Sequence, residues 1–160
     1  MTSQGKASVP QIGEFRVARL RDVPARLVLV SDLVPDEGAC SVLLVSNEWK
    51  CATDKDVLIE PKDSGLAYRV IVESDLTIPL FVAQLDESLG RLAPELRWLA
   101  RPMPDSERVG RLAQALPLLG RRDARWRWKE QELRDLWQLA GPCFLWLVDG
   151  VAWDDAATTP

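Results

Sequence analysis

The sequence predicts a mainly β fold with C-terminal helices (β+α), in which a small curled barrel is extended by two helices. Five short apolar runs, each leucine-rich or β-branched, lie at 27–30, 42–45, 57–59, 70–72 and 80–82. Residues that favour turns separate these runs, for example at 35–38 and 62–65. Beyond residue 101, apolar side chains instead recur at helical spacing.

The barrel is expected to combine one half-exposed strand with several buried ones. Residues 15–20 alternate apolar and polar side chains, which predicts an edge strand with one face in water. The runs at 26–34 and 41–47 lack this alternation and are expected to be covered on both faces. Pro79 is restricted to an edge or a bulge because it has no N–H to donate. Further strands are predicted at 56–60, 69–73 and 76–84, followed by a short closing helix at 85–92.

Two helices are expected after the barrel. The Asp-Ser pair at 105–106 can cap a helix that ends near Pro117. Asp123 can cap a second helix, whose apolar stripe would pack on the barrel. The Gly-Pro pair at 141–142 is expected to end that helix. Residues 143–148 then form either a returning strand or a buried turn of helix.

The chain is expected to fold as one unit with polar ends. We expect a flexible arm, a β-barrel domain, a helical extension packed on the barrel and a disordered tail, at 1–13, 14–100, 101–153 and 154–160. No apolar run approaches the roughly 20 residues that a membrane helix needs, and no apolar segment of signal-peptide length begins the chain. A cytoplasmic protein without membrane contact is therefore expected.

The composition excludes several kinds of site. The chain has no histidine, which removes Ser-His and Cys-His catalytic pairs and histidine-based metal centres. Cys40, Cys51 and Cys143 are odd in number and widely spaced, and reduced thiols are expected. We therefore expect no metal and no cofactor. Any catalysis would depend on Asp, Glu, Lys, Arg, Tyr or hydroxyl groups.

The order of motifs in the barrel resembles that of the PemK/MazF-like toxins. Residues 27–38 form an apolar strand that ends in a Pro-Asp-Glu-Gly loop, and residues 41–47 match the Val-Ser-Asn strand motif of that family. The segment 56–61 is similar to the third strand, and 85–92 to the terminal Leu-Gly-Arg-Leu element. The resemblance covers roughly residues 26–92 and implies an SH3-like barrel. Active members of the family are metal-independent endoribonucleases, found in toxin–antitoxin systems.

The family's catalytic positions are not matched. Its Arg-Pro pair falls on Ala39 and Cys40, or one residue later, and its hydroxyl position falls near Lys62, Asp63 and Ser64. An arginine would stabilise charge on the phosphorane, but no arginine lies between positions 26 and 69. The catalytic candidates that remain are Lys62, Ser64 and Arg69, and the more common interpretation of such a loop is a solvated turn.

A second candidate surface interleaves basic and aromatic side chains. Residues 101–134 carry 9 basic and 5 acidic side chains in a chain whose net charge is −4. Their densest part suits phosphate contact and base stacking, and the candidates for binding nucleic acid are Arg121, Arg122, Arg125, Arg127 and Lys129. The alternative is a helix start in which Trp126 packs inward and the arginine stems cover the apolar rim.

Seven tryptophans exceed what one small core can hold, which indicates an interface. Trp128 and Trp153 are the candidates for partner contact. We therefore predict a non-catalytic or catalytically altered interaction module on a PemK/MazF-like scaffold, in a toxin–antitoxin or phage-defence setting, that binds a protein partner or forms a homodimer. The alternatives are a sequence-specific endoribonuclease toxin that binds RNA, and a structural subunit of a larger assembly.

Overall fold

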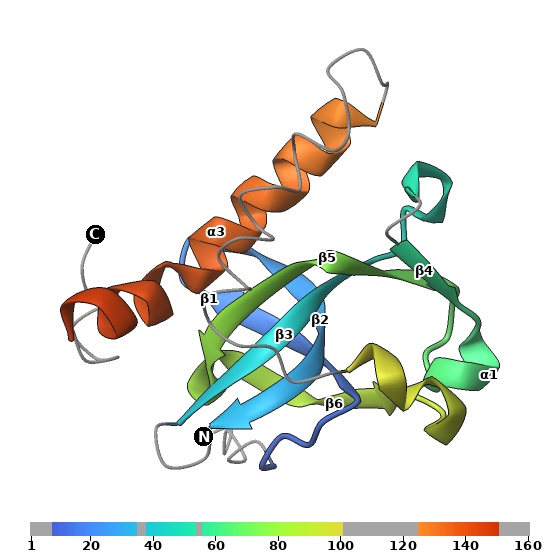
Figure 1. Cartoon of the computed structure of the whole chain (residues 1–160), viewed down its shortest axis with the longest axis horizontal. Helices are drawn as coiled ribbons and strands as arrows, with labels where there is room; N and C mark the ends of the chain where they lie inside the picture. Colours follow the sequence, from blue (N-terminus) through green and yellow to red (C-terminus); the bar gives the residue numbers. More distant parts are fainter. Residues whose placement is uncertain (1–7, 35–37, 54–55, 101–124, 151–160) are drawn as a thin grey trace, which may run out of the picture.

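The fold is a curled six-stranded antiparallel sheet with one long helix on its outer side (Figure 1). The computed structural model describes residues 8–34, 38–53, 56–100 and 125–150. The strand order is β4-β5-β3-β2-β1-β6. The strands are β1 (Glu14–Leu20), β2 (Val23–Val34), β3 (Ala39–Ser46), β4 (Asp56–Ile59), β5 (Val70–Phe81) and β6 (Leu85–Arg91).

The shorter elements connect these strands. They are η2 (Trp49–Cys51), α1 (Pro61–Ser64), η3 (Val82–Gln84) and η4 (Pro94–Leu99). The long helix α3 (Trp126–Asp149) ends at Gly150, whose φ of 70° provides the left-handed cap. No helix in the described part of the chain is long and apolar enough to cross a membrane.

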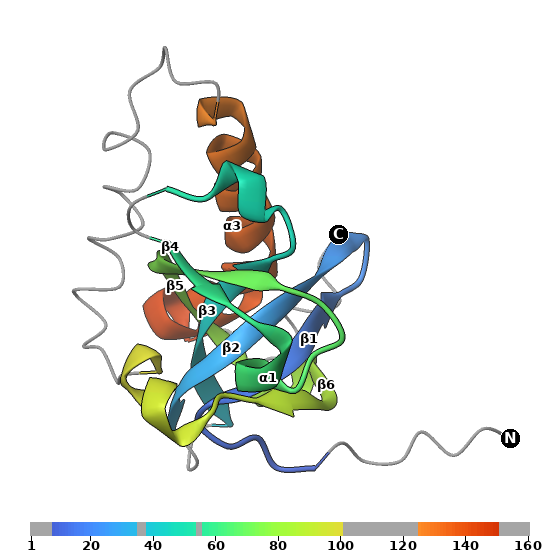
Figure 2. The ribbon, with the colours of Figure 1, turned by 90° about the vertical axis from the view of Figure 1, so that its right-hand side faces the viewer.

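The sheet carries a hydrophobic core on each face, as its unalternating apolar strands predict. Every residue of β3 is buried. Val42 and Leu44 of this strand pack in the core that α3 covers, whereas Leu43 and Val45 pack in the core inside the curled sheet. The prediction that the central strands are covered on both faces is confirmed. Figure 2 shows α3 on one side of the sheet and β6 curling away on the other.

Three predictions about the sheet are wrong. Residues 85–91 form β6 and not a helix, because they pair with β1 from Glu14↔Arg91 to Ala18↔Leu85. That pairing also makes β1 an inner strand, so the edges are β4 and β6. The two strands predicted at 69–73 and 76–84 are one strand, β5, with an irregularity in its pairing opposite Leu43 and Leu44.

The helix α3 runs further than the sequence predicts. Pro142 lies inside it, and residues 143–148 continue the helix. Of the two predicted alternatives, the helical one holds, but the segment is not a buried turn, because Leu145 and Leu147 are 42% and 44% exposed. Proline keeps a helical φ but removes one intrahelical hydrogen bond, so it bends a helix more readily than it ends one. Figure 1 shows α3 changing direction between its orange and red parts. The first predicted helix, at 105–117, lies outside the described residues, as do the tail and residues 1–7.

The described part of the N-terminal arm contacts the sheet. Arg16 of β1 is buried, and its guanidinium donates to the Ser8 carbonyl at 2.9 Å and to the Asp86 carbonyl at 3.0 Å. Ser8 also donates its N–H and hydroxyl to the Glu87 carboxylate, each at 2.9 Å. These contacts hold Ser8 against the start of β6. The division of the chain into an arm, a barrel, an extension and a tail stays a prediction.

Candidate functional site

The predicted catalytic loop forms the short helix α1. Ser64 is fully buried, and its Oγ accepts a hydrogen bond from the Leu66 N–H at 3.0 Å. Gly65 follows in the left-handed region, with φ of 72°. Gly90 of β6 lies so close that a Cβ there would overlap the Ser64 carbonyl oxygen. Ser64 therefore stabilises a turn, while Lys62 is exposed on the same helix.

Arg69 lies on an exposed aromatic and basic surface. Its Nε is 3.0 Å from the Glu60 carboxylate. Its guanidinium lies over the Trp49 ring, 5.2 Å from the centroid, and Lys50 lies 5.7 Å from the same centroid. Trp49 is 42% exposed. The two cations hold the indole at the surface through cation–π contacts.

The two positions that correspond to the family's catalytic groups lie at opposite ends of the sheet. Ala39 begins β3 opposite Phe81, whereas Ser46 ends it opposite Ile71. Ile59, just before α1, pairs with Val70 and so lies at the Ser46 end. At about 3.3 Å per residue, the length of β3 separates the two positions by roughly 23 Å. The structure does not bring them together.

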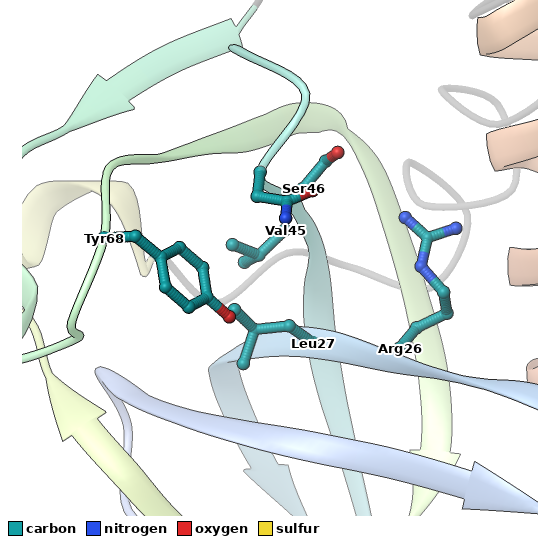
Figure 3. Close-up of a pocket in the computed structure, with 6 residues that line it drawn as sticks. Arg26, Leu27, Val45, Ser46 and Tyr68 are labelled. Atoms are coloured by element: carbon teal, nitrogen blue, oxygen red, sulfur yellow. The ribbon is translucent and has the colours of Figure 1, made fainter.

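A polar pocket of about 170 Å³ opens at the Ser46 end of the sheet (Figure 3). It lies between the start of β2 and the end of β3, next to the segment that precedes β5. Figure 3 shows the Tyr68 ring on one side and the Arg26 guanidinium directed away from it, toward α3. The lining residues are Arg26, Leu27, Val45, Ser46, Asn47 and Tyr68.

Arg26 connects this pocket to α3. Its Nη2 pairs with the Glu132 carboxylate, and its Nη1 lies 2.9 Å from Asp135 Oδ2. All three side chains are mostly buried, at 13%, 8% and 13% exposure. Burial alone would lower the pKa of Arg26, but the hydrogen bond and charge of Glu132, aided by Asp135, raise it above its ordinary value. Arg26 is therefore fully charged and held by two carboxylates.

Lys129 of α3 forms ion pairs with two acidic side chains of the sheet. Its Nζ lies 2.6 Å from Glu73 Oε1 of β5 and 3.1 Å from Asp56 Oδ1 of β4. The three side chains are at most 2% exposed. The prediction that Lys129 contacts nucleic acid is therefore corrected, because the ammonium is buried between two carboxylates in the contact of α3 with the sheet. One cation from each element lies between two acids of the other.

Glu73 carries the strongest perturbation of this cluster. Burial raises its pKa well above the ordinary value of 4.5, and the neighbouring Glu132 raises it further. The positive charge of Lys129 opposes this shift but does not cancel it. A carboxyl group beside a second carboxylate is easier to protonate than an isolated one.

The remaining predicted binding residues are dispersed. Arg125 donates to the Ala52 carbonyl at 2.7 Å, whereas Arg127 is exposed on α3. Trp128 is half-buried, and its ring lies 5.3 Å from the Lys129 ammonium. The structure does not gather these side chains into one basic surface. Arg121, Arg122 and Trp153 lie outside the described residues.

The outer face of α3 carries an apolar groove. Trp137 is 42% exposed and stacks on Phe144, with the ring centroids 4.9 Å apart. The groove has a volume of about 390 Å³ and is lined by Glu130, Leu133, Arg134, Trp137 and Gln138. Glu130 and Arg134, one turn apart, form an ion pair of 3.6 Å beside it. An exposed tryptophan in such a groove is typical of a protein contact surface.

Sequence reasoning missed the residues that form the pocket and the charge cluster. Arg26 lies in the first part of β2, just before the apolar run at 27–30, and its partners lie more than 100 residues later in the sequence. One signal was available: Lys129, Glu132 and Asp135 recur every three residues, which places them on one helix face. No group of three or more Cys, Asp or Glu side chains among the described residues is arranged to hold a metal.

No family model and no curated protein matches the chain. Similar solved structures include a mycobacterial endoribonuclease in complex with its cognate antitoxin, with 18% identity, a TM-score of 0.45, and coverage of 68% of this chain and 96% of that one. They also include the Mycobacterium tuberculosis toxin MazF-mt6, with 20% identity, a TM-score of 0.44, and coverage of 61% and 92%. The second is a toxin of the family that the sequence resembles. At this degree of similarity, function has to be argued from the residues of this chain.

Proposed function

We propose that this protein is a non-catalytic interaction module that pairs with a second copy of itself through the outer face of α3. The observation that carries the proposal is the groove around Trp137, an exposed aromatic side chain in an apolar depression. Tryptophan is the residue type most enriched where binding energy concentrates. The barrel then serves as the scaffold that holds this helix in place.

The absence of catalysis is supported by the environment of the candidate groups. The hydroxyl of Ser64 is buried and occupied by a backbone N–H. Arg69 is paired with Glu60 and stacked on Trp49. The arginine that lines the pocket, Arg26, is held by two carboxylates of α3. A transition-state phosphorane needs unneutralised positive charge, and neither arginine offers it. Lys62, the remaining candidate, is an exposed side chain of α1.

A second copy fits the charges along the groove. Arg127, Glu130, Arg134 and Trp137 recur at three- and four-residue spacing and so share one helix face. If two α3 helices pack antiparallel about a twofold axis near residue 132, Glu130 of one copy faces Arg134 of the other. Arg127 then faces Trp137, which favours a cation–π contact. A self-complementary patch of this kind is what a twofold dimer requires.

The test is the molar mass of the full chain in solution, measured by light scattering after size exclusion. We expect a dimer for the wild type, a monomer for Trp137→Ala, and a dimer for the matched control Trp98→Ala, whose indole is 50% exposed elsewhere. A wild type that stays monomeric at roughly 100 µM, where a dimer with a dissociation constant of about 10 µM is mostly paired, overturns the proposal.

The non-catalytic part is tested with long single-stranded RNA incubated with the protein in EDTA. We expect intact RNA at high protein concentration. Discrete cuts that disappear in Lys62→Ala or Arg69→Ala would instead establish the endoribonuclease alternative. Both side chains are exposed, so their removal leaves the fold intact and the comparison remains valid.

A further inference from the structure

The contact between α3 and the sheet holds an unbalanced set of buried charges. Two cations and four acids lie in it, and none of the six side chains is more than 13% exposed. With every group ionised, these six side chains carry a charge of −2. A buried charge without a counter-charge is costly, and a buried carboxyl group commonly binds a proton instead. The six residues are Arg26, Asp56, Glu73, Lys129, Glu132 and Asp135.

Glu73 is the acid whose hydrogen bonds are incomplete. Its Oε1 lies 2.6 Å from the Lys129 ammonium, but its Oε2 is buried and accepts a hydrogen bond from no described residue. Glu132 of α3 lies within hydrogen-bond reach of the same carboxyl group. Two carboxylates cannot donate to each other, so they repel when both are ionised. One proton on either of them turns the pair into an O–H···O hydrogen bond and reduces the charge of the cluster to −1.

The two aspartates of the cluster do not need that proton. Both carboxylate oxygens of each aspartate accept a hydrogen bond, and donors of this kind stabilise the ionised form. The donors are Lys129 at 3.1 Å and the Thr53 N–H at 2.8 Å for Asp56, and Arg26 at 2.9 Å and Gln131 at 2.8 Å for Asp135. A proton in this cluster is therefore best placed between the two glutamates.

We propose that Glu73 of β5 and Glu132 of α3 share one bound proton at neutral pH, which makes their contact a proton-binding site. The charged side chains around the pair are Lys129 and Asp135 of α3, Asp56 of β4 and Arg26 of β2. The neighbouring strand β3 contributes the apolar Leu44, which pairs with Glu73. Loss of the proton at higher pH restores the repulsion, so the contact of α3 with the sheet weakens as the pH rises. The site lies on the face of α3 turned toward the sheet and does not depend on the pairing of two copies.

The experiment follows the side-chain carboxyl-carbon NMR signals of Glu73 and Glu132 in the full-length wild type, as the pH is raised from about 4 to about 9. Each signal is assigned through the bonds of its own side chain, and its chemical shift distinguishes a carboxyl group from a carboxylate. We expect one proton on the pair at neutral pH. Both signals should change together when it is lost, because coupled groups titrate as a pair. Two signals that are both those of carboxylates at neutral pH overturn the proposal.

A substitution separates a shared proton from one held by burial alone. Glu132→Gln removes the second carboxylate but keeps the size of the side chain, and it should lower the proton affinity of Glu73 at least about tenfold. Glu95→Gln, the same substitution at an exposed glutamate of η4, is the matched control and should leave this affinity unchanged. A Glu73 carboxyl group that binds its proton equally well in Glu132→Gln overturns the sharing. If Glu132→Gln does not fold, the wild-type titration decides, because a proton loss that moves the signal of Glu73 without that of Glu132 also overturns it.

Discussion

Arg26 of β2 and Glu132 of α3 form a mostly buried ion pair at the boundary between the polar pocket and the helix. This pair joins two parts of the chain that are 106 residues apart in sequence. It makes one arginine both a wall of the pocket and an anchor of the helix, so loss of either partner should weaken the contact of α3 with the sheet.

Replacement of Lys129 by methionine should destabilise the fold by about 3–5 kcal/mol. The change keeps the length of the side chain but leaves Asp56 and Glu73 buried without their cation. The measurement is urea unfolding at neutral pH. Lys62→Met, the same substitution at an exposed lysine of α1, serves as the control and should change stability by no more than about 0.5 kcal/mol.

Glu73 should make the protein less stable as the pH rises. Its pKa is higher in the folded chain than the ordinary 4.5, so the folded state binds its proton more tightly. The stabilising contribution is complete below pH 4.5 and is lost as the pH rises through the folded pKa. We therefore expect the free energy of unfolding of Glu73→Gln, relative to that of the wild type, to rise as the pH is raised from about 4 to about 8. The measurement is urea unfolding across this pH range. A difference that is constant with pH would contradict this assignment.

The pKa of Glu14 is shifted in the opposite direction from that of Glu73, so Glu14 provides a control for the pH experiment. Burial would raise its pKa, but hydrogen bonds from Ser88, the Gln11 N–H and Arg16 lower it below 4.5. Its stabilising contribution is present above pH 4.5 and is lost as the pH falls through the folded value. Glu14→Gln should therefore lose most stability at neutral pH and little in acid.

Gly90 should not tolerate even alanine. A Cβ at this position would overlap the backbone carbonyl oxygen of Ser64. Its neighbours are backbone atoms of Ser64 and Gly65, which cannot move aside as the end of a flexible side chain could. We expect Gly90→Ala to lower the thermal midpoint and to disturb the contact between α1 and β6. Gly141→Ala is the matched control, since nothing lies within 4 Å of its new Cβ and alanine favours a helix by about 1 kcal/mol.

Ser64→Ala should destabilise the protein by about 1 kcal/mol, because the buried Leu66 N–H loses its acceptor. Lys62→Ala, two residues earlier and exposed, should have almost no effect. Urea unfolding of both variants checks the assignment of Ser64 to a structural role. Equal stability of the Ser64→Ala variant and the wild type would contradict it.

Local patterns predicted the elements of this fold better than their ends or contacts. The runs at β2 and β3 are apolar on both faces, and they lie in the middle of the sheet. Residues 85–91 resemble a helix locally, but tertiary pairing with β1 makes them a strand. Pro142 indicated a helix end, yet the helix continues to Asp149, and beyond the proline Phe144 packs against the core. Tertiary contacts outweigh local propensity at β6.

The sites were less predictable because they depend on pairs of distant residues. Nothing near Arg26 in the sequence identifies two acids on a helix that begins 100 residues later. Lys129 belongs to a basic run, and its burial follows only from the position of Asp56 and Glu73 on the sheet. Exposed charge and buried charge look the same in a sequence.

The reciprocal ion pairs of Arg26 and Lys129 also determine how α3 can lie on the sheet. Each cation must meet two carboxylates from the other element, so a slide of one helical turn, about 5.4 Å, would leave both cations and all four acids without partners. The charges therefore select one alignment of α3 on the sheet, and a helix of equal apolarity but different charge spacing would leave these buried groups unpaired.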